Sequence, residues 1–276
     1  ILNLKYFSLV FRSRIFCYDL SVVPLLQRMS NLEELHLSLQ CYQQQSLIDG
    51  NHLKDNILRH LSHLRIFQFN ICSFVDRYDR LNLLSNQYIR NTFQNLPTDE
   101  IVSSIDYFPE ENRSQCHAYS LPYTLTTYER ITNHFSGGLF VNVRQISLFD
   151  EKPFEHEFFI RIQKSFPFVN DLTVFNTKAQ ANNQNNFQLI HYPHLRRLWL
   201  CFADESYVEQ FLLSTKSALP FNLNLYVGYE VIRRVTHDFK RFQTRINSSK
   251  INCIYEDRKH QFSKDFLRYF LTTEYM

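Results

Sequence analysis

The chain has 276 residues, of which 44% are hydrophobic and 21% are charged, and its formal net charge is +3. This length suits one large domain or two small ones, and the composition is that of a folded protein rather than a disordered one. The nearly balanced charge gives no reason to expect nucleic acid as a partner. We expect no membrane partner either, because no apolar run approaches the ~18 residues that span a bilayer.

The six cysteines are spread through hydrophobic stretches, and none of them forms a C-x-x-C pair. This pattern predicts buried free thiols in a reducing compartment, so we expect a cytoplasmic or nuclear protein. Two N-glycosylation sequons begin at Asn112 and Asn247. They do not change this expectation, because such triplets are common by chance in a chain rich in asparagine.

A nine-residue unit with apolar residues spaced as L-x-x-L-x-L occurs six times. The six copies contain NLKYFSLV, NLEELHLSL, HLRIFQFNI, NVRQISLFD, FVNDLTVF and HLRRLWLCF. The middle apolar residue of the unit, here called the second anchor, falls at positions 7, 35, 67, 146, 172 and 198. Repeats of 20–29 residues with this spacing are typical of leucine-rich repeats, in which each copy contributes one strand to a parallel sheet.

The segments between these strands have apolar residues at helical spacing, which predicts return helices that cover one face of the sheet. The expected helices are 50–64, 153–166, 204–219 and 229–242. Pro153 in a first turn and Asp204 as an N-cap support two of these helix starts. Alternating apolar residues predict two further strands, at 222–228 and 251–255.

These elements predict an α/β fold, namely a leucine-rich-repeat solenoid over residues 1–276. Its curved parallel sheet is expected to line the concave side, and its helices are expected to line the convex side.

The stretch 76–135 contains no clean repeat and is expected to be an insertion at the rim of the solenoid. Segments 101–108 and 115–123 predict a hairpin that projects from this rim. The start of an F-box resembles NLPTDEIVSSIDYF at 95–108, but this stretch has one residue too many between Pro97 and Glu100. It also lacks the later leucines and the tryptophan of that motif, so we do not interpret it as an internal F-box.

No motif for catalysis, for nucleotide binding or for a metal site occurs in the sequence. The pairs His60/His63 and His191/His194 have no further ligands at a characteristic distance. The basic stretch 233–250 is interpreted as the solvated face of a helix rather than as a phosphate site. We therefore expect no catalytic, cofactor-binding or metal-binding residues, and a protein that is not an enzyme.

The chain resembles the divergent F-box/leucine-rich-repeat proteins through the segments 26–42, 149–168, 192–200 and 235–247. This resemblance implies the substrate-recognition part of an F-box-type ubiquitin ligase adaptor, in which the repeats hold a protein substrate. The F-box that would dock onto the ligase is expected upstream of Ile1. The alternative is a stand-alone protein-interaction solenoid, such as a scaffold or a sensor, with no ubiquitin link.

Residues beside the last two anchors of each repeat are expected to point away from the core. On three neighbouring repeats they predict a protein-binding patch on the concave face, because aromatic and arginine side chains dominate binding hot spots. The patch consists of Ser147, Phe149, Thr173, Phe175, Arg197 and Trp199. The alternative is that the C-terminal segment or the rim hairpin covers these side chains.

Overall fold

The computed structural model describes residues 3–43, 46–76, 85–94, 96–98, 100–181, 188–255, 263–270 and 274–275. The chain is a mixed α/β protein with parallel strands and helices, as predicted. The sequence predicted one solenoid over 1–276, whereas the contacts within the chain separate two compact units. Unit 1 comprises residues 1–123 and unit 2 comprises residues 124–276.

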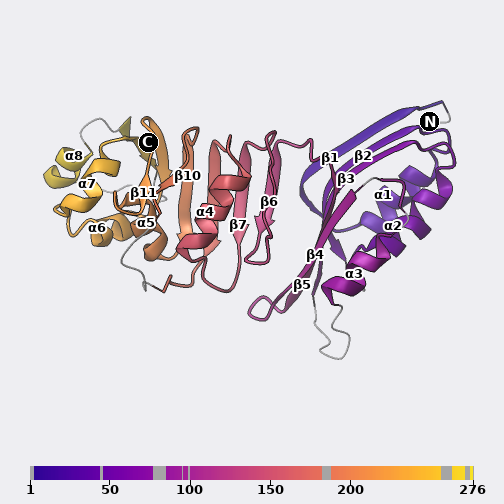
Figure 1. The fold of residues 1–276 in the computed structure, drawn as a ribbon, viewed down its shortest axis with the longest axis horizontal. Coiled ribbons are helices and arrows are strands. Elements are labelled where there is room, and N and C mark those ends of the chain that lie inside the picture. The colour runs from indigo at the N-terminus through magenta and orange to yellow at the C-terminus, as the bar shows by residue number, and fades with distance from the viewer. Residues whose placement is uncertain are drawn as a thin grey trace. The chain divides into compact units, whose positions relative to one another are not determined.

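Unit 1 contains a five-stranded sheet in the order β1-β2-β3-β5-β4 (Figure 1). Strands β1, β2 and β3 run parallel, and β5 is antiparallel to both β3 and β4. The strands are β1 (Tyr6–Ile15), β2 (Glu34–Gln43), β3 (Ile66–Asp76), β4 (Glu100–Phe108) and β5 (Arg113–Leu121). The helices, which lie along one face of the sheet in Figure 1, are α1 (Tyr18–Gln27), α2 (Gly50–Asn56), the 3₁₀ helix η1 (Leu58–His60) and α3 (Asn86–Thr92).

The second anchors of unit 1 lie side by side across the sheet. Phe7 on β1 is opposite Leu35 on β2, and Leu35 is opposite Phe67 on β3. Burial alternates along β2, so that Leu35 and Leu37 face the helices and are almost fully buried. The repeat pattern therefore predicted both the positions of these strands and the face that they bury.

The predicted hairpin forms, but it does not project from a rim. β5 pairs with β3 from Asn70–Tyr119 to Asp76–Arg113 and so continues the sheet of unit 1. Burial explains this arrangement, because a projecting hairpin would expose Ala118 and Tyr119, which are 1% and 3% exposed in the sheet. The stretch 95–108, which is similar to the start of an F-box, forms strand β4 from Glu100 onward. This agrees with the prediction that the stretch is not an internal F-box.

Unit 2 contains a seven-stranded parallel sheet in the order β14-β13-β12-β10-β8-β7-β6, and a two-stranded parallel sheet of β9 and β11. The strands are β6 (Thr127–Ile131), β7 (Gln145–Phe149), β8 (Asp171–Asn176), β9 (Ile190–His191), β10 (Arg197–Ala203), β11 (Ser217–Ala218), β12 (Leu223–Tyr226), β13 (Ile251–Tyr255) and β14 (Glu274–Tyr275). The helices are α4 (His156–Ser165), α5 (Glu205–Leu212), α6 (Tyr229–Val235), α7 (Phe242–Ser248) and α8 (Lys264–Tyr269).

The second anchors of unit 2 are also in register. Ile146 is opposite Leu172, Leu172 is opposite Leu198, and Leu198 is opposite Leu225 on the predicted strand β12. All four side chains are at most 3% exposed. The gap in the repeat pattern contains an additional parallel strand, β6, whose Tyr128 takes the anchor place opposite Ile146.

The four predicted helices form as α2 with η1, α4, α5 and α6 and are shorter than predicted, whereas α1, α3, α7 and α8 were not predicted. Asp204 caps α5 as expected, because its Oδ1 accepts a hydrogen bond of 2.9 Å from the Ser206 N–H. α4 begins at His156 rather than in a turn at Pro153, and the Phe154 N–H before the helix donates to the Tyr207 hydroxyl at 2.9 Å. None of the helices in the described ranges is long and apolar enough to cross a membrane.

Candidate protein-binding face

The sheet of unit 2 has one face that is opposite its buried anchors, here called the open face. Ser147, Thr173 and Trp199 alternate with buried residues along β7, β8 and β10, and each of them is partly exposed. The register places Ser147 opposite Thr173 and Thr173 opposite Trp199. Strand β12 adds Tyr226 opposite Trp199, so four strands contribute one continuous middle row.

Trp199 stacks on Tyr226 within this middle row. Their ring centroids are 3.4 Å apart and their planes differ by 8°. Stacking restricts the rotamers of the indole, so little side-chain entropy would be lost in a contact with another molecule. The pair presents a flat aromatic surface with a polar group on each ring, which is typical of side chains at protein interfaces.

A polar row crosses the open face one step before the middle row. It consists of Gln145, Asp171, Arg197 and Asn224, which are paired in register across β7, β8, β10 and β12. The Arg197 Nε donates to Asp171 Oδ2 at 2.8 Å. Because the Arg197 side chain is 44% exposed, this ion pair adds little to stability; its main effect is to fix the direction of the guanidinium.

An aromatic row crosses the open face on the other side of the middle row. Phe149 is opposite Phe175, and Phe175 is opposite Phe202. The rings of Phe175 and Phe202 stack with centroids 5.5 Å apart, and Phe202 is 59% exposed. The Arg130 guanidinium lies 3.7 Å from the centroid of the Phe149 ring, where a cation–π contact holds both side chains.

The structure brings all six residues of the predicted patch together on this face. None of them is buried: five are partly exposed and Arg197 is exposed. The proposed role of these residues in binding stays a prediction.

Sequence reasoning missed three members of the same face, namely Tyr226, Phe202 and Arg130. Tyr226 follows from the alternation of the predicted strand 222–228, so the sequence contained the signal. Phe202 rather than Cys201 lies opposite Phe175, because the register between β10 and β8 shifts after Trp199. Arg130 lies on β6, a strand that has no clean repeat pattern.

The open face offers aromatic surface, hydroxyl groups, amides and one ion pair, which is a set of groups suited to holding a partner. Within the described ranges, no three His, Cys, Asp or Glu side chains are grouped closely enough to hold a metal ion. Comparison with known proteins gives no further guidance, since the chain matches no family model, no curated protein and no solved structure.

Proposed function

We propose that this chain is a protein-binding module that holds its partner on the open face of unit 2. The observation that carries this proposal is the cluster of solvent-accessible rings in the middle and aromatic rows. Trp199 and Tyr226 are stacked and Phe202 is 59% exposed, and Arg197 lies in the adjacent polar row. Tryptophan, tyrosine and arginine are the residue types that contribute most to binding energy at protein interfaces.

The proposal includes the architecture, a leucine-rich-repeat solenoid with the open face on its concave side. It is supported by parallel strands that follow one another in chain order and by anchors that remain in register from repeat to repeat. In a solenoid, equivalent positions of successive repeats form one extended surface, on which a partner contacts several strands at once. The three rows of the open face have this property.

The test compares two variants of the open face with a matched control. Trp199→Ala and Phe202→Ala remove rings from β10, and Phe242→Ala removes a ring that is 74% exposed at the start of α7. Immobilised wild type and variants are incubated with a lysate of the source cells, and the retained proteins are quantified by mass spectrometry.

We expect the same retained protein to be lost with Trp199→Ala and with Phe202→Ala but kept with Phe242→Ala. Truncating a hot-spot residue costs about 2 kcal/mol, which is a loss of roughly thirtyfold in affinity. Circular dichroism checks that each variant is folded. Equal recovery of every specifically retained protein by all four proteins would contradict binding at the open face.

The resemblance of the repeats to F-box/leucine-rich-repeat proteins extends the proposal to a ubiquitin ligase adaptor, in which this chain recognises the substrate. The support is the repeat pattern alone, and sequencing of the transcript upstream of Ile1 is the direct test. An in-frame F-box supports the adaptor role. A start codon without an F-box leaves a stand-alone interaction module, such as a scaffold or a sensor.

A further inference from the structure

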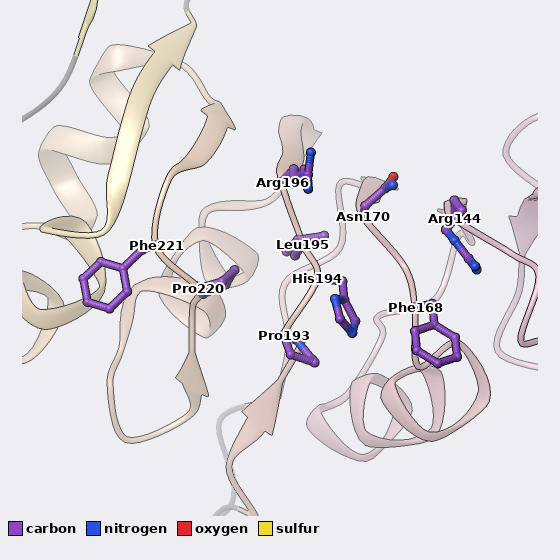
Figure 2. A pocket seen from close by; sticks show the side chains of 9 residues that line it. All are labelled: Arg144, Phe168, Asn170, Pro193, His194, Leu195, Arg196, Pro220 and Phe221. Carbon is purple, nitrogen blue, oxygen red and sulfur yellow. The ribbon is translucent and has the colours of Figure 1, made fainter.

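A pocket of about 380 Å³ lies in unit 2 at the amino ends of its strands (Figure 2). The loops that lead into β7, β8, β10 and β12 supply its nine lining residues. Arg144, Asn170 and Arg196 immediately precede β7, β8 and β10, respectively. The pocket is therefore built by equivalent positions of successive repeats.

Backbone hydrogen bonds fix the order of these three side chains. The Asn170 N–H donates to the Arg144 carbonyl at 2.8 Å, and the Arg196 N–H donates to the Asn170 carbonyl at 2.8 Å. Neighbouring strands are ~4.8 Å apart, so the two arginines are attached to the sheet ~10 Å from each other. The Asn170 amide lies between them and can donate to the same ligand.

The charged side chains that line the pocket are all positive. Two guanidinium groups line it, and none of the described residues that line it is acidic. The exposed Arg196 side chain makes no ion pair or hydrogen bond with another described residue. Arg197, Arg234 and Arg241 of the same unit, by contrast, each pair with a carboxylate.

Aromatic rings form the apolar part of the pocket wall. Phe168 and His194 contact each other with ring centroids 5.5 Å apart, and the Arg144 guanidinium lies 5.2 Å from the centroid of the Phe168 ring. Phe221, at the far end of the pocket, is 74% exposed, and the Lys250 ammonium is 5.6 Å from its ring centroid. Figure 2 shows these rings on both sides of Pro193 and Leu195.

We propose that this pocket is a binding site for an acidic peptide segment in an extended, polyproline II-like conformation. Such a segment has three residues per turn and rises ~3.1 Å per residue, so carboxylates three residues apart stand on one side, ~9 Å from each other. This separation matches the attachment points of Arg144 and Arg196. The aromatic and proline wall provides the apolar contact that grooves for such segments use.

Single-stranded nucleic acid fits the pocket less well. Stacking of bases requires free ring faces, whereas Arg144 lies over one face of Phe168, His194 lies on its flank, and the Lys250 ammonium lies over the Phe221 ring. None of the nine lining residues belongs to a row of the open face. A Trp199→Ala variant is therefore expected to bind the acidic peptide as the wild type does, and this separates the present proposal from the proposed function.

The test uses fluorescence anisotropy with labelled peptides at ~50 mM salt, where screening of exposed charges is modest. The probe is a peptide of four Glu-Pro-Pro repeats, and the neutral comparison is a peptide of four Gln-Pro-Pro repeats. Arg196→Gln removes the unpaired cation of the pocket, and the matched control Arg233→Gln removes a cation on α6, where Arg233 pairs with Glu230. A thymidylate dodecamer tests the nucleic-acid alternative.

We expect saturable binding of the Glu-Pro-Pro peptide and no binding of the Gln-Pro-Pro peptide. Arg196→Gln should raise the Kd of the Glu-Pro-Pro peptide about fivefold, the equivalent of ~1 kcal/mol for an exposed ion pair. Arg233→Gln should leave this Kd unchanged. Three outcomes would overturn the proposal: equal binding of both peptides, equal weakening by both variants, or tighter binding of the oligonucleotide through Arg196.

Discussion

Leu198 and Trp199 are neighbours in the chain, but the register assigns them to opposite faces of the unit 2 sheet. Leu198 is 0% exposed and pairs with Leu172 and Leu225 in the core. Replacing it with alanine removes buried atoms and leaves a cavity that the surrounding repeats fill only in part. We expect Leu198→Ala to lower the free energy of unfolding of unit 2 by about 3–4 kcal/mol.

The measurement is urea unfolding followed by tryptophan fluorescence. Trp199 is the single tryptophan of the chain and lies in unit 2, so its emission reports on that unit. With an m-value of about 2 kcal/mol per molar urea, the expected loss lowers the unfolding midpoint by roughly 1.5–2 M. The m-value itself should stay constant if only the native state is affected.

Thr173→Ala is the matched control, because Thr173 lies on the neighbouring strand β8 and points to the open face. Its truncation leaves no buried cavity and should cost less than about 1 kcal/mol, mostly through strand propensity. Equal midpoints for Leu198→Ala and Thr173→Ala would refute the assignment of the two faces. That result would also remove the basis for the proposed patch.

Three further predictions concern stability. Gly50→Ala should lower the free energy of unfolding of unit 1 by more than about 2 kcal/mol, because a Cβ there would lie 2.1 Å from the Thr92 carbonyl oxygen. Thermal unfolding followed by circular dichroism measures this loss. In the control Gly228→Ala, the added Cβ would meet its nearest atom at 3.8 Å, so stability should change little. Burial lowers the pKa of His117 to about 4, so the unfolded chain takes up a proton before the fold does, and unit 1 should lose up to about 3 kcal/mol as the pH falls from 6.5 to 4. His117→Gln should flatten this part of the pH profile, and an unchanged profile would exclude His117 as its cause. Asn247→Ala should cost about 3 kcal/mol or more in urea unfolding, because the buried amide bonds four backbone groups of unit 2, whereas Ser249→Ala at an exposed position should cost far less.

The anchors were the most predictable part of the fold. Their spacing identifies which residues lie on one face of a strand, and the structure pairs anchor with anchor wherever the pattern is clean. Residue type alone would not have sufficed in a chain with 26 phenylalanines. Phe154 is 0% exposed and Phe221 is 74% exposed, and only their positions relative to the repeat distinguish them.

The failures have physical causes that a repeat pattern does not encode. The partner of the hairpin was missed because the sequence of segment 115–123 does not indicate which strand edge is free to pair with it, and β3 provides that edge. Phe202 was missed because a shift in register between two strands depends on their mutual backbone hydrogen bonds. The helix predicted at 229–242 ends after Val235, where the chain takes positive φ angles at His237, Asp238 and Phe239.

The proposed functions of unit 2 both depend on the same register. Arg196 lines the pocket, Arg197 belongs to the polar row, Leu198 fills the core and Trp199 belongs to the middle row. Because side chains alternate along a strand, a slip by one residue would place Leu198 on the surface and Trp199 in the core. The observed register therefore predicts three effects that can be measured separately. Leu198→Ala should lower the free energy of unfolding. Arg196→Gln should weaken only the binding of the acidic peptide, and Trp199→Ala should weaken only the binding of the partner to the open face.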